Sequence, residues 1–164
     1  MAFAHWPDVL RKEAAELNPN YNQTITLYNC LKAADNPEKK DIWYRHVLSE
    51  CYYKAAINRM ESGARSGIGM IAAMQSVYTV RIPQSAAYRP YHEWAKLSEA
   101  ERRQCFTGRL DDIVIVGNCE EEITGLAGQT ATQVMGRYKP DAFKVTAFSD
   151  NTKVPMAKHY RLGG

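Results

Sequence analysis

Apolar residues recur at spacings of three and four through the first third of the chain, which is the pattern of an amphipathic helix. A helix start signal at Asn36-Pro37 opens the strongest of these stripes, which predicts one long helix reaching about Met60. Two shorter helices are predicted before it, one ending near Leu17 and one over residues 24–34. The residues of the long stripe are Tyr44, Val47, Leu48, Cys51, Tyr52 and Ala55.

Ser62-Gly63 should end the long helix, and the elements predicted after it are shorter. A further helix is predicted over residues 65–77. The alternating, β-branched stretch 78–83 closes with a proline and predicts a short strand. Ser98 and Glu101 have the spacing of a capping box, which predicts a helix ending near Gly108.

A last long helix is predicted to begin at Asp111-Asp112, where carboxylates favour a helix N-terminus, and to reach about Val134. Residues 113–116 taken alone also fit a strand, and three glycines weaken the helix. No periodicity follows Asp150, so residues 151–164 are expected to form an extended C-terminal tail. The pattern as a whole predicts a mainly α fold in a single domain over residues 1–150, with 1–36 as an N-terminal helical extension.

Composition narrows the function classes. The net charge of +3 is too small for histone-like binding of nucleic acid, although converging basic side chains can still neutralise a few phosphates. The four cysteines are widely spaced, without a C-x-x-C pair, and are expected to be reduced thiols. The first residues lack the pattern of a secretory signal, and the longest apolar stretch, 68–80, is too short to span a bilayer. We therefore expect a soluble, cytosolic protein with no membrane partner.

Catalytic motifs are weak. The stretch SGARSGIG at residues 62–69 resembles the phosphate loop of short-chain dehydrogenases, but the residues before it predict a helix where that loop needs a strand. The four histidines are isolated, and the three consecutive acids Glu120, Glu121 and Glu122 fit a solvated helix face. We predict that the chain is not an enzyme and binds no cofactor or metal.

Four segments, in this order, resemble the coat proteins of rod-shaped plant RNA viruses such as tobamoviruses, tobraviruses, hordeiviruses and benyviruses. They are SGARSGI with IAAM at residues 62–74, TVRIPQ at 79–84, RLDD at 109–112, and a Tyr and a Phe five residues apart within 136–143. The resemblance covers roughly residues 40–145. It departs from the family in a short segment between Phe106 and Asp111 and in the residues around Pro140 and Lys144.

The resemblance implies a four-helix-bundle-like core and a structural coat subunit that self-assembles helically and encapsidates single-stranded RNA through non-specific phosphate contacts. It implies a virion protein of the host cytoplasm. The planar guanidinium of arginine can donate two hydrogen bonds to one phosphate, and the exposed amides at a helix start attract the negative charge of the phosphate. The RNA-binding residues expected on this basis are Arg65, Ser66, Arg109, Asp111 and Asp112.

Asp111 and Asp112 have two interpretations. They can be plain capping carboxylates at a helix start. They can also orient the arginines and repel one another when RNA is absent, which would make assembly sensitive to pH.

Two alternative functions remain open at this point. Leu27-Tyr28-Asn29, with Trp43 to Arg45 following, resembles the LYR motif of accessory subunits in large mitochondrial complexes, although Asn29 replaces the diagnostic arginine. A head or adaptor protein of a tailed phage would also be a small assembling chain.

Overall fold

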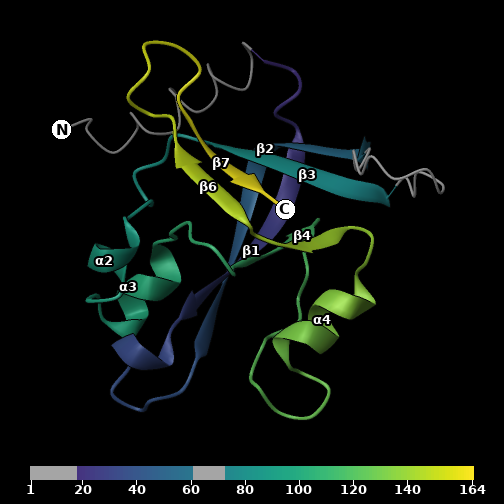
Figure 1. Cartoon of the computed structure of the whole chain (residues 1–164). Coiled ribbons are helices and arrows are strands. Elements are labelled where there is room, and N and C mark those ends of the chain that lie inside the picture. Colours follow the sequence, from purple (N-terminus) through teal and green to yellow (C-terminus); the bar gives the residue numbers. More distant parts are fainter. Residues whose placement is uncertain (1–17, 61–72) are drawn as a thin grey trace, which may run out of the picture.

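The computed structural model of the chain describes residues 18–60 and 73–164, and it is mainly β (Figure 1). The predicted mainly α, four-helix-bundle-like fold is therefore wrong. The strands are β1 Gln23–Leu31, β2 Ile42–Met60, β3 Ala73–Pro83, β4 Ile113–Val116, β5 Ala142–Lys144, β6 Ala147–Asp150 and β7 His159–Gly163. The helices are the 3-10 turn η2 Ala33–Asp35 and the short α2 Tyr91–Trp94, α3 Glu99–Gln104 and α4 Ala131–Arg137.

The strands of the described residues form one seven-stranded sheet in the order β5-β4-β1-β2-β3-β7-β6, with antiparallel pairing throughout. Only Val145 and Thr146 separate β5 at one edge from β6 at the other, so the sheet curls until its edges are neighbours in the chain. Both linking residues are hydrogen-bonded: Val145 N donates to Asp112 O over 2.8 Å, and Thr146 N donates to Gly163 O over 2.8 Å.

A β-bulge explains why β2 resembles a helix in sequence. Its buried residues alternate at Tyr44, His46 and Leu48 as in any strand, but the next buried residue is Cys51. Glu50 has φ 55, and the register of β1 against β2 shifts here. Because of the bulge, the buried residues Tyr44, Leu48 and Cys51 are separated by four and three positions, which is the spacing of a helix. Val47, which the helical pattern would bury, is 42% exposed.

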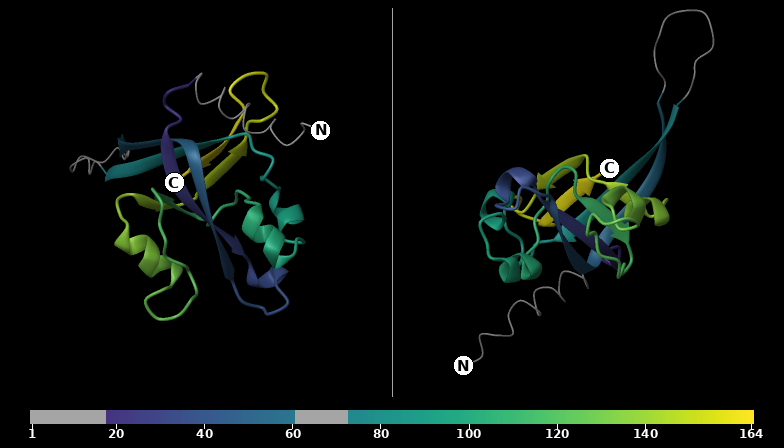
Figure 2. Two further views of the ribbon diagram at one scale, coloured as in Figure 1. Left: turned by 180° about the vertical axis from the view of Figure 1, so that it is seen from behind. Right: turned by 90° about the horizontal axis from the view of Figure 1, so that it is seen from below.

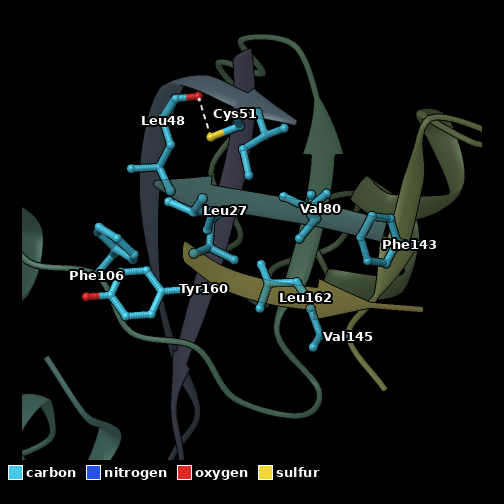
Figure 3. Packing of buried hydrophobic residues seen from close by; sticks show 12 residues of the cluster. Leu27, Leu48, Cys51, Val80, Phe106, Phe143, Val145, Tyr160 and Leu162 are labelled. Carbon is cyan, nitrogen blue, oxygen red and sulfur yellow. Dashed lines mark hydrogen bonds between the residues drawn. The ribbon is translucent and has the colours of Figure 1, made fainter. Parts of the chain in front are cut away.

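The strand β1 also lacks the alternating pattern of a strand, because both of its faces are covered. Every residue from Ile25 to Leu31 is buried. One face points into the curl of the sheet, where Leu27 meets Val80 and Leu162 (Figure 3). Tyr28, on the other face, packs under α4 and the segment before it. A strand buried on both sides loses the alternation that identifies strands in a sequence.

Three clusters make up the core. The largest fills the curl of the sheet, the second lies between β1, β4 and α4, and the third packs α2 against the far ends of β1 and β2. Trp94 of α2 is fully buried in the third cluster, where its Nε1 donates to Cys105 O over 2.8 Å and its ring meets Tyr44 edge-on at 5.3 Å. The short helices α2 and α4 thus pack against the sheet and cover parts of its surface.

Some local predictions are confirmed by the structure and others are wrong. The strand at 78–83 is confirmed as the second half of β3, and the Ser98–Glu101 capping box is confirmed at the start of α3. The helix predicted over 65–77 is wrong from residue 73 onward, where β3 begins, and the helix over 24–34 is replaced mainly by β1. The N-terminal helix to residue 17 lies outside the described residues.

The last third of the chain differs most from expectation. Residues 113–116 form strand β4, and α4 is the only helix that the structure describes between Asp111 and Asp150. Gly117, Gly125 and Gly128 all have positive φ, which ends the strand and shapes the loop before α4. The predicted C-terminal tail is also wrong, because β7 lies inside the sheet between β3 and β6. No helix in the described residues is long and apolar enough to cross a membrane.

Candidate functional site

The five predicted RNA-binding residues fall into two groups. Arg65 and Ser66 lie outside the described residues. Arg109, Asp111 and Asp112 lie together just before β4, beside the end of β1. None of the three begins a helix, so the capping interpretation of Asp111 and Asp112 is wrong.

Asp112 is an internal anchor rather than a surface group, with only 1% of its area exposed. Its carboxylate accepts hydrogen bonds from Asn29 Nδ2 at 2.8 Å, Cys30 N at 3.1 Å and Arg109 N at 3.0 Å. Burial raises the pKa of Asp112 to about 7, against the lowering effect of these three donors. Asn29 also bonds both backbone groups of Thr107. The network ties β1 to the segment that enters β4.

Asp111 points outward from the same turn, with φ 75. Its carboxylate meets Lys144 Nζ at 2.8 Å and Lys32 Nζ at 4.0 Å, and Lys144 holds the pKa of Asp111 below its usual value. The Arg109 guanidinium lies 4.0 Å from the centre of the Tyr91 ring, and its Nη1 is buried without a hydrogen-bond partner among the described residues. Arg109 is thus held against the protein by an aromatic face. RNA binding by these three residues stays a prediction.

The other distinctive feature is the projecting end of the β2–β3 hairpin, here called the ribbon and defined as residues 55–60 of β2 and 73–78 of β3. Six residue pairs from Ala55↔Tyr78 to Met60↔Ala73 hold it together. Pairing of β1 with β2 stops at Cys51, and pairing of β7 with β3 starts at Thr79. Figure 2 shows these paired strands extending away from the rest of the described chain.

The ribbon is poorly covered for a pair of strands. Ile57 is 72% exposed, although it lies on the same strand face as Tyr53, which packs against the core in the curl. Gln75 and Ser76 on β3 are exposed as well. The ribbon therefore exposes both apolar and polar side chains. Its two outer strand edges do not pair with any named strand of the described residues.

Two shallow grooves adjoin the ribbon. The one on the outer sheet face has a volume of about 410 Å³ and is bordered by Gln75, Val77, Arg161 and Gly163. The second, of about 390 Å³, lies on the other face over Tyr78 and Phe143, whose rings stack at 4.9 Å. Both are open and shallow, which suits a flat partner better than a small ligand.

Nothing in the described residues gathers three or more His, Cys, Asp or Glu side chains into a metal-binding group. His46 is buried, and desolvation lowers its pKa to about 4. The most suggestive surface is therefore the ribbon, which sequence reasoning missed. One signal for it was present: residues 73–80 contain no Asp, Glu, Lys or Arg, although half of them lie on an outer face.

A family model described as "Family of unknown function (DUF6751)" matches residues 20–164, nearly the whole chain. No curated protein and no solved structure matches. The match spans all the strands and helices described above, from β1 to β7.

Proposed function

Because this chain belongs to the family described as "Family of unknown function (DUF6751)", its function has to be argued from geometry, and we propose that it is a structural subunit that assembles with copies of itself through the ribbon. The curled sheet is the stable body of this subunit, and the ribbon is its contact arm.

The observation that carries the proposal is the ribbon's lack of support. An isolated two-stranded hairpin is marginally stable in water, and a stable sheet usually needs a third strand or a packed face. The ribbon has six residue pairs beyond the last neighbouring strand, and Ile57 is 72% exposed on it. Contact with another subunit would bury Ile57 and supply the missing support.

This proposal keeps only one part of the sequence-based coat prediction, namely self-assembly. Packaging of single-stranded RNA was expected at helix starts in a four-helix-bundle-like core, and the described residues form a sheet instead. Arg109 is stacked on Tyr91 and Asp111 is paired with Lys144, so both side chains are already held by other groups of the protein. RNA packaging and a virion location remain predictions that the ribbon does not support.

The test is the oligomeric state of the purified full chain, measured by light scattering across a concentration series and by negative-stain electron microscopy. We expect oligomers that Ile57→Lys dissociates, because the lysine would be buried without a partner in the contact. Leu126→Lys is the matched control, since Leu126 is 68% exposed but lies in the loop before α4. A wild-type chain that stays monomeric at all concentrations contradicts the proposal.

Electron microscopy also separates the other candidates. Closed rings favour the phage head or adaptor alternative, because rings arise from head-to-tail contacts that close. Extended rods favour the coat prediction. A monomer that gains order only with a foreign subunit favours the accessory-subunit alternative.

A further inference from the structure

We propose that the free edge of β3 pairs antiparallel with the same edge of a second copy, about a two-fold axis at Gln75, which joins two ribbons into one four-stranded sheet. This inference rests on the proposed self-assembly and adds an edge contact to the face contact that buries Ile57. The edge contact consists of residues 73–77 of each copy, held by main-chain hydrogen bonds.

The hydrogen bonds of Tyr78 show which backbone groups of β3 point toward the edge that no described strand pairs. Tyr78 N donates to Gly164 O over 2.7 Å, and Gly164 N donates to Tyr78 O over 3.2 Å. Tyr78 therefore directs both of its backbone groups to the β7 side. Backbone direction alternates along a strand, so Ser76 and Met74 direct theirs to that side as well. There β7 has ended, and no named strand of the described residues takes its place.

Symmetry and the bonds already made by Tyr78 determine the register of the pair. In an antiparallel pair, two residues that lie opposite each other have their side chains on the same face of the sheet. A two-fold axis perpendicular to the sheet therefore lies where one residue faces its own copy, and not midway between two successive residues. An axis at Ser76 would place Met74 opposite Tyr78, whose groups Gly164 already uses. An axis at Gln75 places Ser76 of each copy opposite Met74 of the other. The N–H and C=O groups of both residues are then satisfied in both copies.

The two outer edges of the ribbon differ in charge. Natural sheets protect free edges with lysine, proline or a bulge, because an unprotected edge pairs with other chains. The β2 strand has Arg59 within the ribbon and Lys54 just before it, and a two-fold axis along this edge would bring these positive charges toward those of the other copy. The β3 edge has no charged residue from Ala73 to Val80. Like-charge repulsion therefore opposes self-pairing at β2 and is absent at β3.

Space at the edge also fits a second strand. β7 ends at Gly163, and Gly164 follows it beside the edge of β3, where it bonds Tyr78. The two glycines present no side chain where the incoming strand would start. An added strand at a sheet edge gains affinity from its main chain, which is the ordinary mode of β-augmentation.

The sharpest test is a disulfide across the axis. Gln75 would face its own copy in a non-hydrogen-bonded pair, where the Cα atoms are close enough for a disulfide. We expect Gln75→Cys to form a covalent dimer on mild oxidation, seen on a non-reducing gel. Both this variant and its control carry Cys105→Ser, because Cys105 is partly exposed whereas the other three native cysteines are buried.

The control is Asn58→Cys. Asn58 is exposed and lies directly opposite Gln75 within the ribbon, but on β2, one strand further from the axis. It should remain monomeric on the same gel. Equal cross-linking of the two variants, or no cross-linking of Gln75→Cys, overturns the proposed register.

A second variant removes the hydrogen bond without changing charge. Ser76→Pro deletes an N–H that points to the free edge, so the ladder between β2 and β3 keeps all its bonds. We expect at least a tenfold rise in the dimer dissociation constant, with circular dichroism unchanged and Ser76→Ala behaving like the wild type. A Ser76→Pro chain that dimerises as tightly as the wild type overturns the edge contact.

The two proposals fail differently. If Ile57→Lys dissociates the oligomer while Ser76→Pro and Gln75→Cys have no effect, copies meet through the ribbon's face, and only the edge proposal is lost. A monomeric wild type contradicts both.

Discussion

The two ends of the β1–β2–β3 unit are built from similar residues but have opposite surroundings. Along β1 every residue from Ile25 to Leu31 is buried, and polar Asn29 is held inside by Thr107 and Asp112. Along the ribbon Ile57 is mostly exposed, and beyond the Tyr78–Gly164 contact no third strand of the described residues pairs with either of its strands. The difference shows that the fold is stabilised at one end of the hairpin, which leaves the other end available for contacts.

The largest effect should come from removing apolar volume at the enclosed end. Leu27→Ala deletes a fully buried side chain inside the curl of the sheet and should lower the free energy of unfolding by about 3 kcal/mol. Ile57→Ala, measured at a concentration where the chain is monomeric, should change it by less than about 0.5 kcal/mol. Urea unfolding of both variants checks the contrast, and equal losses would show that the ribbon belongs to the core.

A slightly smaller effect is expected from the buried polar network. Asn29→Ala removes one donor from Asp112 and leaves Thr107 N and O without their partner, which should cost about 2 kcal/mol. Asn58→Ala on the exposed ribbon is the control and should be within about 0.5 kcal/mol of the wild type. Thermal unfolding of the two variants at one pH measures the difference.

The network should also give the protein a pH dependence. Burial raises the pKa of Asp112 from 3.8 to about 7, so the folded state binds a proton that the unfolded state has lost between these values. The contribution of Asp112 is therefore complete below pH 3.8 and is lost as the pH rises through 7. Melting temperatures of the wild type should fall with pH between about 6.5 and 8, where the opposite contribution of His46 is already complete.

Asp112→Asn isolates this contribution. The variant is expected to be less stable overall, because its amide would place a donor among three donors. Its melting temperature should no longer fall between about pH 6.5 and 8. His46 does not imitate the effect, because its lowered pKa makes stability rise with pH between about 4 and 6.5. An identical pH slope in wild type and Asp112→Asn would show that Asp112 stays ionised in the fold.

The smallest effect is expected on the outer surface of the enclosed end. Arg137 Nη2 meets Glu121 Oε2 at 2.9 Å, with both side chains more than a third exposed. Exposed pairs of this kind contribute little, so Glu121→Gln should lower the free energy of unfolding by less than about 1 kcal/mol. The remaining loss should shrink further in high salt, as unfolding at two salt concentrations would reveal.

Sequence reasoning succeeded where one local rule determined the structure. The alternation at 78–83 and the Ser98–Glu101 capping box each depend on a few neighbouring residues, and both are confirmed. It failed in β2 because the bulge at Glu50 produces helical spacing from strand burial. It failed in β1 because the cover on its second face comes from a loop far along the chain, where Tyr28 donates to Glu121 O at 2.7 Å.

The candidate site was predicted only in part, for a similar reason. The sequence placed Arg109, Asp111 and Asp112 together, and the structure keeps them within one turn. Their environments could not be read from the sequence, because the partner of Asp112 is Asn29, 83 positions away. The ribbon was missed because its exposure depends on where β1 and β7 stop pairing, and no local pattern marks those points.

The two-residue link between β5 and β6 has a consequence for how far the sheet can deform. Val145 and Thr146 carry the chain directly from one outer strand to the other. The end of β5 and the start of β6 are thus linked covalently by two residues. The distance between these two strand ends cannot exceed the length of that link, however far the curled sheet opens by thermal motion. A flexible insertion after Val145 would lengthen the tether, let the curl open, and expose two further strand edges to pairing with other chains.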